Sequence, residues 1–360
     1  MTATTDSISA AVLGATGYVG GELLRLIAAH PQIRLGAAVS GSRGGDRIGA
    51  AFPHLAAAYD EAEFTVPGQW AETLEPGSNV ALFSAAPHGA SAALVANAME
   101  QAAARNLKLR VVDCSADFRY ADAEQYRDVY GSAHAAPSLL DNFHCAVPEH
   151  SASPGAGRAA EHIGHPGCFA TAVLLAAVPL VRSGLSSGPL FVNGITGSTG
   201  SGRSAQPGTH HPERHSNLYA YKPLQHRHVP EIVQLIKDAC NARVAINFVP
   251  HSGPFARGIY VTLQASLVSG TRAEDVRRAF VDDYAGAAFV RLVDGAPKLK
   301  DVVASNWCHI GIRCENDSVV VMSAIDNLVK GAAGGALQWM NRLWSLPETS
   351  GLLAPAPAWT

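Results

Sequence analysis

A cysteine near the middle of the chain stands in a setting that suits nucleophilic chemistry. Cys168 follows the turn residues Pro166 and Gly167 and begins a long apolar run rich in alanine and leucine. This pattern predicts a buried helix that ends near Ser183 and Gly184, with Cys168 in its first turn. The unpaired backbone N–H groups and the helix dipole at that position lower the pKa of a thiol. Cys168 is therefore a candidate nucleophile, and the alternative is a buried structural cysteine.

Two histidines further along the chain are candidates for the acid/base group that works with such a thiol. His226 and His228 open another predicted helix, and they share one side if their stretch is extended. Either or both could face Cys168. More histidines lie at 210–215, but the i, i+4 helical pair and the Cys/His spacing of a zinc site are missing, so we expect no metal.

The N-terminal segment has the pattern of a dinucleotide-binding turn. An apolar strand that begins near Ser9 runs into glycines spaced three apart and then into an amphipathic helix, a G-x-x-G-x-x-G variant of the nucleotide fingerprint. Such glycines let the backbone turn tightly and approach a pyrophosphate that rests on the helix N-terminus. The alternative is a tight turn without a ligand. The residues expected to contact the cofactor here are Gly14, Thr16, Gly17, Tyr18 and Val19.

The end of the second predicted strand, 33–39, indicates which nucleotide binds. An NAD-binding fold would place an acidic residue there to hold the ribose 2′-hydroxyl. The chain instead has Ser40 and Arg43 among further serines and glycines. Hydroxyls, backbone amides and one guanidinium suit a 2′-phosphate, so the sequence favours NADP over NAD. For Arg43 alone, a solvated loop charge is the alternative.

Strands and helices then alternate along the first half of the chain. Strand 80–84, helix 91–105 and strand 109–113 follow one another. This alternation predicts an α/β fold with a parallel, doubly wound sheet whose ligand lies at the carboxyl ends of the strands. The stretch from about 120 to 163 has a looser sequence pattern, with Pro, His, Ser and Gly throughout. We interpret it as loops that cross toward a second domain.

Polar residues follow directly on two of these strands. Ser84, Pro87 and His88 belong to a small-residue loop that would face the cofactor, although His88 could equally be a capping or surface residue. Arg119 follows the next strand and is a possible substrate ligand.

The second half of the chain offers three more polar candidates. The loop 197–203 is rich in backbone donors and ends at Arg203, and it is either an anion nest or a mobile linker. Arg257 sits just before a predicted strand. Asn327 comes after the strand 318–323 and could bond a nicotinamide carboxamide.

Composition excludes several classes of function. The 360 residues are 48% hydrophobic and 16% charged, which is typical of a globular protein large enough for two domains. A net charge of −3 without a long basic run suggests no nucleic-acid or anionic membrane partner. The N-terminus has no signal-peptide pattern and no apolar run reaches spanning length, so we expect a cytoplasmic protein. Six cysteines without a CxxC pair are expected to be reduced.

Taken together in order, four motifs strongly resemble the N-acetyl-γ-glutamyl-phosphate reductase family. Two further stretches, 115–119 and 250–259, also look like it, so the resemblance runs from about residue 9 to 345. The four motifs are Gly14-Ala15-Thr16-Gly17-Tyr18-Val19-Gly20, His165-Pro166-Gly167-Cys168, His226-Arg227-His228-Val229-Pro230-Glu231-Ile232 and Asp326-Asn327-Leu328-Val329-Lys330-Gly331.

The resemblance implies an architecture and an activity. Members of this family are NADP-dependent enzymes of arginine biosynthesis, similar in fold to aspartate-semialdehyde dehydrogenase. It implies a Rossmann-type NADP-binding domain over 1–163, completed by 327–360. A central α/β domain over 164–326 would carry the catalytic cysteine and the interface of a homodimer or homotetramer.

The resemblance also implies roles for single residues and a reaction. Cys168 is then the nucleophile and His228 the acid/base, with His226 as the alternative, and a small-molecule acyl phosphate is the substrate. Thiolate attack releases phosphate and leaves a thioester, which NADPH reduces to a semialdehyde. The positions that the family would use to contact substrate are Arg203, Glu231 and Arg257.

Two departures from the family pattern keep other substrates open. Phe169-Ala170 stands where the family often has Tyr-Pro. The stretches 210–214 and 221–223 look closer to the reductase of the carrier-protein lysine pathway, whose aminoadipyl phosphate is tethered to a small acidic carrier protein. An aspartate-semialdehyde dehydrogenase and a non-catalytic NADP-sensing regulator are further alternatives.

Overall fold

Two β-sheets, each in its own unit, organise the part of the chain that the computed structural model describes, residues 7–151 and 161–359. The chain passes from unit 1 to unit 2 between His165 and Pro166, just before Cys168. Each unit is assembled from separate stretches: unit 1 from 7–145, 161–165 and 333–353, and unit 2 from 146–151, 166–332 and 354–359.

Unit 1 is built on a seven-stranded sheet in which all neighbouring strands run parallel. Its strands are β1 (Ile8–Leu13), β2 (Ile33–Val39), β3 (Phe64–Thr65), β4 (Asn79–Ser84), β5 (Lys108–Asp113), β6 (Phe143–His144) and β7 (His162–Gly164). The order β3-β2-β1-β4-β5-β7-β6 reverses direction beside β1, so β1 and β4 meet at the switch point where doubly wound folds bind nucleotides. The predicted parallel α/β sheet is confirmed.

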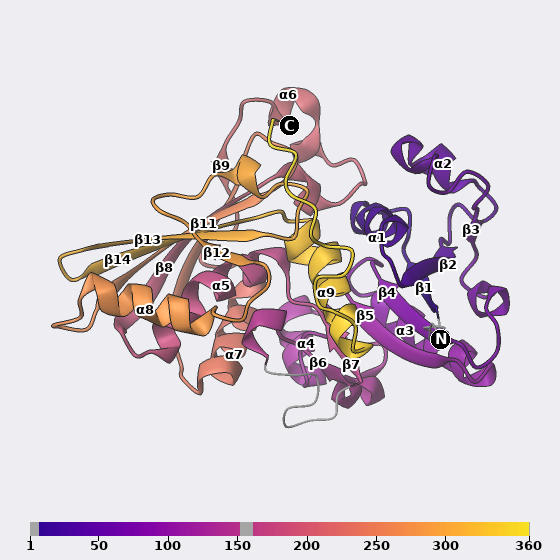
Figure 1. Ribbon diagram of the computed structural model, residues 1–360, viewed down its shortest axis with the longest axis horizontal. Helices are drawn as coiled ribbons and strands as arrows, with labels where there is room; N and C mark the ends of the chain where they lie inside the picture. The colour runs from indigo at the N-terminus through magenta and orange to yellow at the C-terminus, as the bar shows by residue number, and fades with distance from the viewer. Residues whose placement is uncertain (1–6, 152–160, 360) are drawn as a thin grey trace, which may run out of the picture. The chain divides into compact units, whose positions relative to one another are not determined.

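One helix of unit 1 comes from the far end of the sequence. The α-helices of this unit are α1 (Tyr18–Ala28), α2 (Ile48–Ala51), α3 (Ser91–Ala104), α4 (Ala123–Tyr130) and α9 (Gly334–Leu343). The last of these contacts β5 and α1 and buries Trp339 completely (Figure 1). The Nδ1 atom of His30 accepts from the N–H of Ile33 at 2.8 Å, so its Nε2 donates to the Asn341 side chain at 3.0 Å. That bond fixes α9 against the end of α1.

The interpretation of residues 120–163 as loops was wrong for the part that the structure describes. Helix α4 and the short strands β6 and β7 lie there, and both strands extend the sheet of unit 1. Strands of two and three residues are too short to show an alternating apolar pattern, so no signal for them could be found in the sequence.

Unit 2 is built on a mixed sheet with the order β12-β13-β14-β11-β8-β10-β9. Its strands are β8 (Ser186–Thr196), β9 (Tyr219–Ala220), β10 (Ile246–Ser252), β11 (Ile259–Leu267), β12 (Val290–Leu292), β13 (Cys308–Glu315) and β14 (Ser318–Ile325). Its α-helices are α5 (Cys168–Arg182), α6 (His211–Arg214), α7 (His228–Cys240) and α8 (Ala273–Asp283), and a π-helical turn follows over Val329–Ala333. Figure 1 shows α5, α7 and α8 on one side of this sheet.

Helix α5, which begins at Cys168, is the central helix of unit 2. Residues 169–180 are all buried, because α7, α8 and the strands β11 and β14 contact it from several sides. Pro179 has no N–H to give to the carbonyl of Leu175, and the hydroxyl of Tyr284 donates to that oxygen instead at 2.7 Å. The uniformly apolar run after Cys168 therefore encodes a fully surrounded helix, as its sequence predicts.

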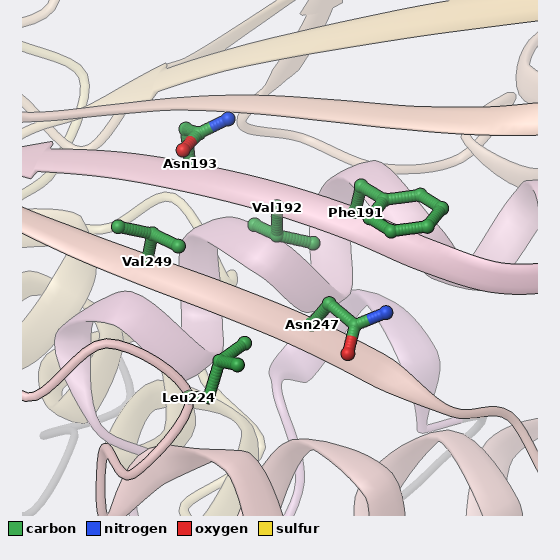
Figure 2. A pocket seen from close by; sticks show the side chains of 6 residues that line it. All are labelled: Phe191, Val192, Asn193, Leu224, Asn247 and Val249. Atoms are coloured by element: carbon green, nitrogen blue, oxygen red, sulfur yellow. The ribbon is translucent and has the colours of Figure 1, made fainter.

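The other face of this sheet is open among the described residues. Along β8, buried positions alternate with exposed ones, and the Phe191 side chain is 52% exposed. Figure 2 shows Phe191 and Asn193 on β8 beside Asn247 and Val249 on β10, with Leu224 from the adjoining loop. Helices cover one side of the sheet, and an apolar, solvent-accessible surface remains on the other side.

Candidate functional site

The glycine turn of unit 1 is packed so closely that two of its glycines admit no side chain. Gly14 follows β1 with φ of +69°, and a Cβ there would lie 2.7 Å from the backbone oxygen of Ala85, which follows β4. A Cβ on Gly20 would lie 2.6 Å from the Gly14 oxygen. The turn thus brings the ends of β1 and β4 together at the start of α1, as a dinucleotide site requires.

The N-terminus of α1 fits a phosphate group. Gly17 occupies the N-cap position and no side chain caps the helix. Backbone N–H groups at an uncapped helix start point outward and favour an anion. Thr16, Tyr18 and Val19 adjoin this position, and the Tyr18 side chain is 37% exposed. The five residues predicted to contact the cofactor therefore lie together in one turn.

The turn after β2 is held by its first serine. The Ser40 hydroxyl is buried and accepts from the backbone N–H groups of Ser42 and Arg43 at 3.3 and 3.2 Å. The Arg43 guanidinium is partly exposed and lies 3.4 Å from Asp46. An exposed ion pair of this kind is weak and can exchange for a phosphate. No carboxylate stands at the carboxyl end of β2 itself, as the sequence indicates.

The loop after β4 belongs to a buried polar network. The Ser84 hydroxyl bonds Ser91 at 2.6 Å, and Ser91 donates to the Asp113 carboxylate at 2.7 Å. Burial raises the pKa of Asp113, and hydrogen bonds from Ser115 and Ser91 partly offset that effect. The Ser84 side chain thus has an internal partner, and its contact with a cofactor remains a prediction.

Two hydrogen bonds to the segment after β5 hold the same loop in place. His88 accepts the backbone N–H of Ala116 through Nδ1 at 3.0 Å, and Asp117 accepts the N–H of Gly89 at 2.8 Å. Pro87 lies between Ser84 and His88 and is exposed. The sequence did not identify Asp117 as a structural partner, because the bonded residues lie far from it along the chain.

Arg119 holds the backbone that leads to the cysteine. Its guanidinium is buried, and its Nε and Nη2 atoms donate to the carbonyls of His165 and Cys114 at 3.0 and 3.2 Å. The N–H of His165 donates to the Asp113 carbonyl at 2.7 Å. The predicted substrate ligand is thus engaged by main-chain oxygens, and a substrate contact through it stays a prediction.

Cys168 occupies the first position of α5, as predicted. Gly167 is the N-cap residue, and no side chain caps the helix, so the partly buried thiol belongs to a helical turn whose backbone N–H groups have no side-chain cap. Gly331, in the π-helical turn, lies against it: a Cβ on Gly331 would stand 2.8 Å from the Cys168 Cβ. The backbone of a distant segment therefore forms one wall of the thiol site.

Glu231 ties the two helices of the site together. Its carboxylate is 1% exposed and accepts the N–H of Gly167 at 2.7 Å. The bond joins the first turn of α7 to the N-cap of α5, beside Cys168. The carboxylate of Glu231 thus has a backbone partner within the protein, and the expected substrate contact through it stays a prediction.

The two candidate histidines pack on the residue next to the cysteine. The rings of His226 and His228 lie 5.8 and 6.5 Å from the Phe169 ring, and 4.7 Å from each other. Burial, together with the positive charges of Arg227 and Lys222, lowers the pKa of His226 to about 4. Its Nδ1 accepts the N–H of His228 at 3.2 Å. His226 is therefore neutral near pH 7.

Tyr221 is a member of this site to which the sequence analysis assigned no role. Burial raises its pKa, and the negative charge of Cys168 adds to that effect. Its ring lies 5.7 Å from the His226 ring. The phenol therefore stays protonated close to the thiol. In the sequence, Tyr221 belongs to the stretch 221–223, which was noted only for its likeness to the lysine-pathway reductase, and no periodic signal marks the residue itself.

A buried carboxylate organises the turn that carries Gly331. Asp326 is fully buried and accepts two bonds from the Arg257 guanidinium, at 3.0 and 3.1 Å. It also accepts the N–H groups of Ala304, Leu328 and Val329 at 2.6, 2.8 and 2.8 Å. Arg257 thus has an internal ion pair, and a direct substrate contact through it remains a prediction.

Asn327 joins three segments of unit 2. Its Oδ1 accepts the N–H of Gly258 at 2.6 Å, and its Nδ2 donates to the Thr199 hydroxyl at 3.0 Å. The amide that was predicted to bind a nicotinamide is engaged within the protein. Arg203, in the same loop as Thr199, is exposed.

Two features are absent from residues 7–151 and 161–359. No group of three or more histidine, cysteine, aspartate or glutamate side chains is arranged to hold a metal ion there. None of the helices in those residues has the length and apolarity needed to cross a membrane.

Comparison with protein families matches nearly the whole chain in two parts. Residues 9–162 match the NAD binding domain of semialdehyde dehydrogenase, and residues 168–327 match the semialdehyde dehydrogenase dimerisation domain. Among solved structures, aspartate semialdehyde dehydrogenase II of Vibrio cholerae superposes with a TM-score of 0.68 at 17% identity, over 95% of this chain and 99% of that one. The enzyme of Candida albicans, solved with NADP, gives 0.63 at 15% identity, over 94% and 98%.

Relatives of much higher identity have one name in common. The N-acetyl-gamma-glutamyl-phosphate reductase of Pseudomonas paraeruginosa is 39% identical over 350 residues, 96% of this chain and 98% of the relative. Proteins of the same name from Methanopyrus kandleri and Symbiobacterium thermophilum are 38% and 36% identical, over 96% and 98% of this chain and 97% and 99% of their own.

The contact between Gly331 and Cys168 can be tested with one methyl group. In Gly331→Ala the new Cβ must displace the thiol or the turn, because it would lie 2.8 Å from the Cys168 Cβ. A displacement of this size lowers kcat by about tenfold or more. Gly286→Ala is the control, since a Cβ at Gly286 meets nothing within 4 Å. Equal steady-state rates for the two variants would contradict the assignment of this wall.

Proposed function

The chain belongs to the N-acetyl-γ-glutamyl-phosphate reductase family, and on that premise we propose that it reduces N-acetylglutamyl 5-phosphate with NADPH. The products are N-acetylglutamate 5-semialdehyde and phosphate, and the step belongs to arginine biosynthesis. The observation that carries this proposal is Cys168 at the uncapped start of a buried helix, with two histidines packed on the next residue. The relatives do not favour the carrier-linked lysine-pathway substrate.

The residues of unit 1 fit NADP. The Gly14 and Gly20 positions leave no room for a Cβ, the α1 N-terminus is uncapped, and the exposed Arg43 stands where a 2′-phosphate would need a cation. In its reduced form the bound nicotinamide supplies the hydride. The turn between β1 and α1 would hold the pyrophosphate, and the turn after β2 would hold the ribose phosphate.

The residues of unit 2 account for the rest of the chemistry. The Cys168 thiolate attacks the acyl carbon, the bond to phosphate breaks, and a thioester forms at Sγ. Backbone N–H groups at the start of α5 stabilise the oxyanion, and Glu231 holds their geometry through Gly167. His228 gives a proton to the carbonyl oxygen during reduction and takes it back as the product leaves.

His226 is a poorly matched acid/base on physical grounds. A general acid/base works best with a pKa near the operating pH, and the pKa of His226 lies at about 4. The Nδ1 of His226 is also occupied by the N–H of His228. We therefore assign the proton transfer to His228 and a positioning role to His226.

The proposed nucleophile is tested with Cys168→Ser. The serine hydroxyl is a far weaker nucleophile at neutral pH, so NADP reduction by N-acetylglutamate 5-semialdehyde and phosphate should be lost, while NADPH binding, followed by fluorescence, is retained. Cys314→Ser is the control, because burial raises the pKa of that thiol and keeps it protonated. Near-normal turnover in Cys168→Ser would refute the mechanism. Turnover of aspartate semialdehyde instead of the acetylated substrate would refute the substrate.

The two histidines are separated by paired asparagine variants. His228→Asn should lower kcat by about 10²- to 10⁴-fold, because the proton carrier is removed. His226→Asn should retain most of the activity, since the asparagine oxygen can accept the His228 N–H in place of Nδ1. Steady-state kinetics in both directions measure the difference. A larger loss in His226→Asn would reverse the assignment.

We further propose that a second copy of the chain covers the open face of the unit 2 sheet. Residues 168–327 match a dimerisation domain, and this face exposes Phe191 and Leu224 by 52% and 62% (Figure 2). Homodimer interfaces are rich in such apolar side chains.

Light scattering on the purified protein tests this surface. Wild type should have at least the mass of a dimer, and Phe191→Asp should be a monomer, because it would bury two unpaired carboxylates in a symmetric interface. Val281→Asp is the control, since Val281 is 47% exposed but lies on α8, which belongs to the helical side. A Phe191→Asp variant with unchanged mass would exclude this face.

A further inference from the structure

The side chain of one buried arginine in unit 2 has no partner among the residues that the structure describes. Arg214 ends the short helix α6 and is 7% exposed, yet its Nε, Nη1 and Nη2 atoms make no hydrogen bond within residues 7–151 and 161–359. It forms no ion pair with those residues either. Burying an uncompensated charge is costly, and a guanidinium cannot escape the cost by losing its proton.

Arg119, also buried, makes the contrast clear. It is 6% exposed, and its guanidinium donates to two backbone carbonyls. Arg257, which is partly buried, forms a two-pronged ion pair with Asp326. Arg119 and Arg257 thus have acceptors within the protein, whereas the Arg214 guanidinium has none among the described residues. A bound anion would supply the acceptor that this guanidinium lacks there.

The segment that carries Arg214 is tied at both ends to other parts of unit 2. At its start, the Thr199 hydroxyl accepts from Asn327 at 3.0 Å and donates to the Ala256 carbonyl at 2.6 Å. At its end, β9 pairs with β10, and Tyr221 lies within the electrostatic influence of Cys168.

The loop between these anchors packs on itself. A Cβ at Gly208 would lie 3.1 Å from the Tyr219 hydroxyl, so the turn before α6 rests on β9. Arg214 donates its backbone N–H to the His210 carbonyl and accepts from Asn217. The helix that presents the guanidinium is therefore fixed to the strand that leads to Tyr221.

We propose that Arg214 binds an oxyanion of the substrate. The inference rests on the proposed function, which supplies two such groups: the α-carboxylate and the phosphate. The planar guanidinium fork matches either one with two parallel hydrogen bonds. The unpaired charge in the absence of ligand is the cost of a site prepared for that anion.

Arg214→Met tests the proposal in the reverse reaction. Loss of a charged hydrogen-bonding partner should raise one KM by about 10- to 100-fold while kcat changes little. A raised KM for phosphate identifies the phosphate as the ligand. A raised KM for N-acetylglutamate 5-semialdehyde identifies the carboxylate, and in that case wild type but not the variant should prefer this aldehyde over 4-acetamidobutanal, which lacks the carboxylate.

Thermal unfolding separates this role from a structural one and needs no turnover. Without ligand, Arg214→Met should have a Tm equal to or above that of wild type, because an uncompensated buried charge is removed. Inorganic phosphate or N-acetylglutamate should raise the Tm of wild type, and the variant should lose the response to one of them. Arg277→Met is the matched control, since Arg277 is a largely exposed arginine on α8 whose nearest carboxylate is 3.8 Å away.

The failure of either proposal can be recognised. If wild type binds both anions but does not oxidise the semialdehyde, the proposed function is wrong and the anion site stands. If Arg214→Met keeps both KM values and both Tm responses, the anion site is wrong and the proposed function stands. A lower Tm with unchanged binding, or a changed oligomeric mass alone, would also overturn the anion site.

Discussion

The geometry of the thiol site depends on one buried carboxylate. A charge removed from water must be matched by donors around it, and Asp326 takes them from three parts of unit 2: the Arg257 guanidinium, the backbone of Ala304 and the turn that follows β14. Because the same turn continues to Gly331, whose N–H bonds the Asp326 carbonyl at 3.0 Å, the wall beside Cys168 is set by this carboxylate.

Ionisable side chains near the site mostly hold backbone in place. Glu231 fixes the N-cap of α5, and Arg119 fixes the carbonyl of His165 at the crossing between the units. Both act on main-chain atoms within a few residues of Cys168. A thiol whose reactivity comes from backbone donors requires those donors to be held in fixed positions. Charged residues that the family motif would assign to substrate binding can therefore contribute to catalysis by positioning the backbone.

The sequence was informative where the signal is local. The strand-glycine-helix pattern and the apolar run after Cys168 predicted the parallel sheet and the helix that begins at the cysteine, since each depends on neighbouring residues. Asp326, Tyr221 and Arg214 lie in stretches that the sequence analysis quotes, but it assigned them no role, because their significance comes from partners far along the chain or from the lack of one. Short strands such as β7 were not predicted, because three residues are too few to show an alternating apolar pattern.

The contribution of α9 to unit 1 has a consequence for how the protein is made. Unit 1 begins with β1 yet contains residues 333–353, and His30 finds its partner Asn341 only there. Domains generally fold during synthesis from the N-terminus onward. Here the ribosome must translate every residue of the unit 2 sheet before the first unit receives its last helix. During synthesis, the nucleotide-binding unit is therefore completed only after the domain inserted within it has been translated.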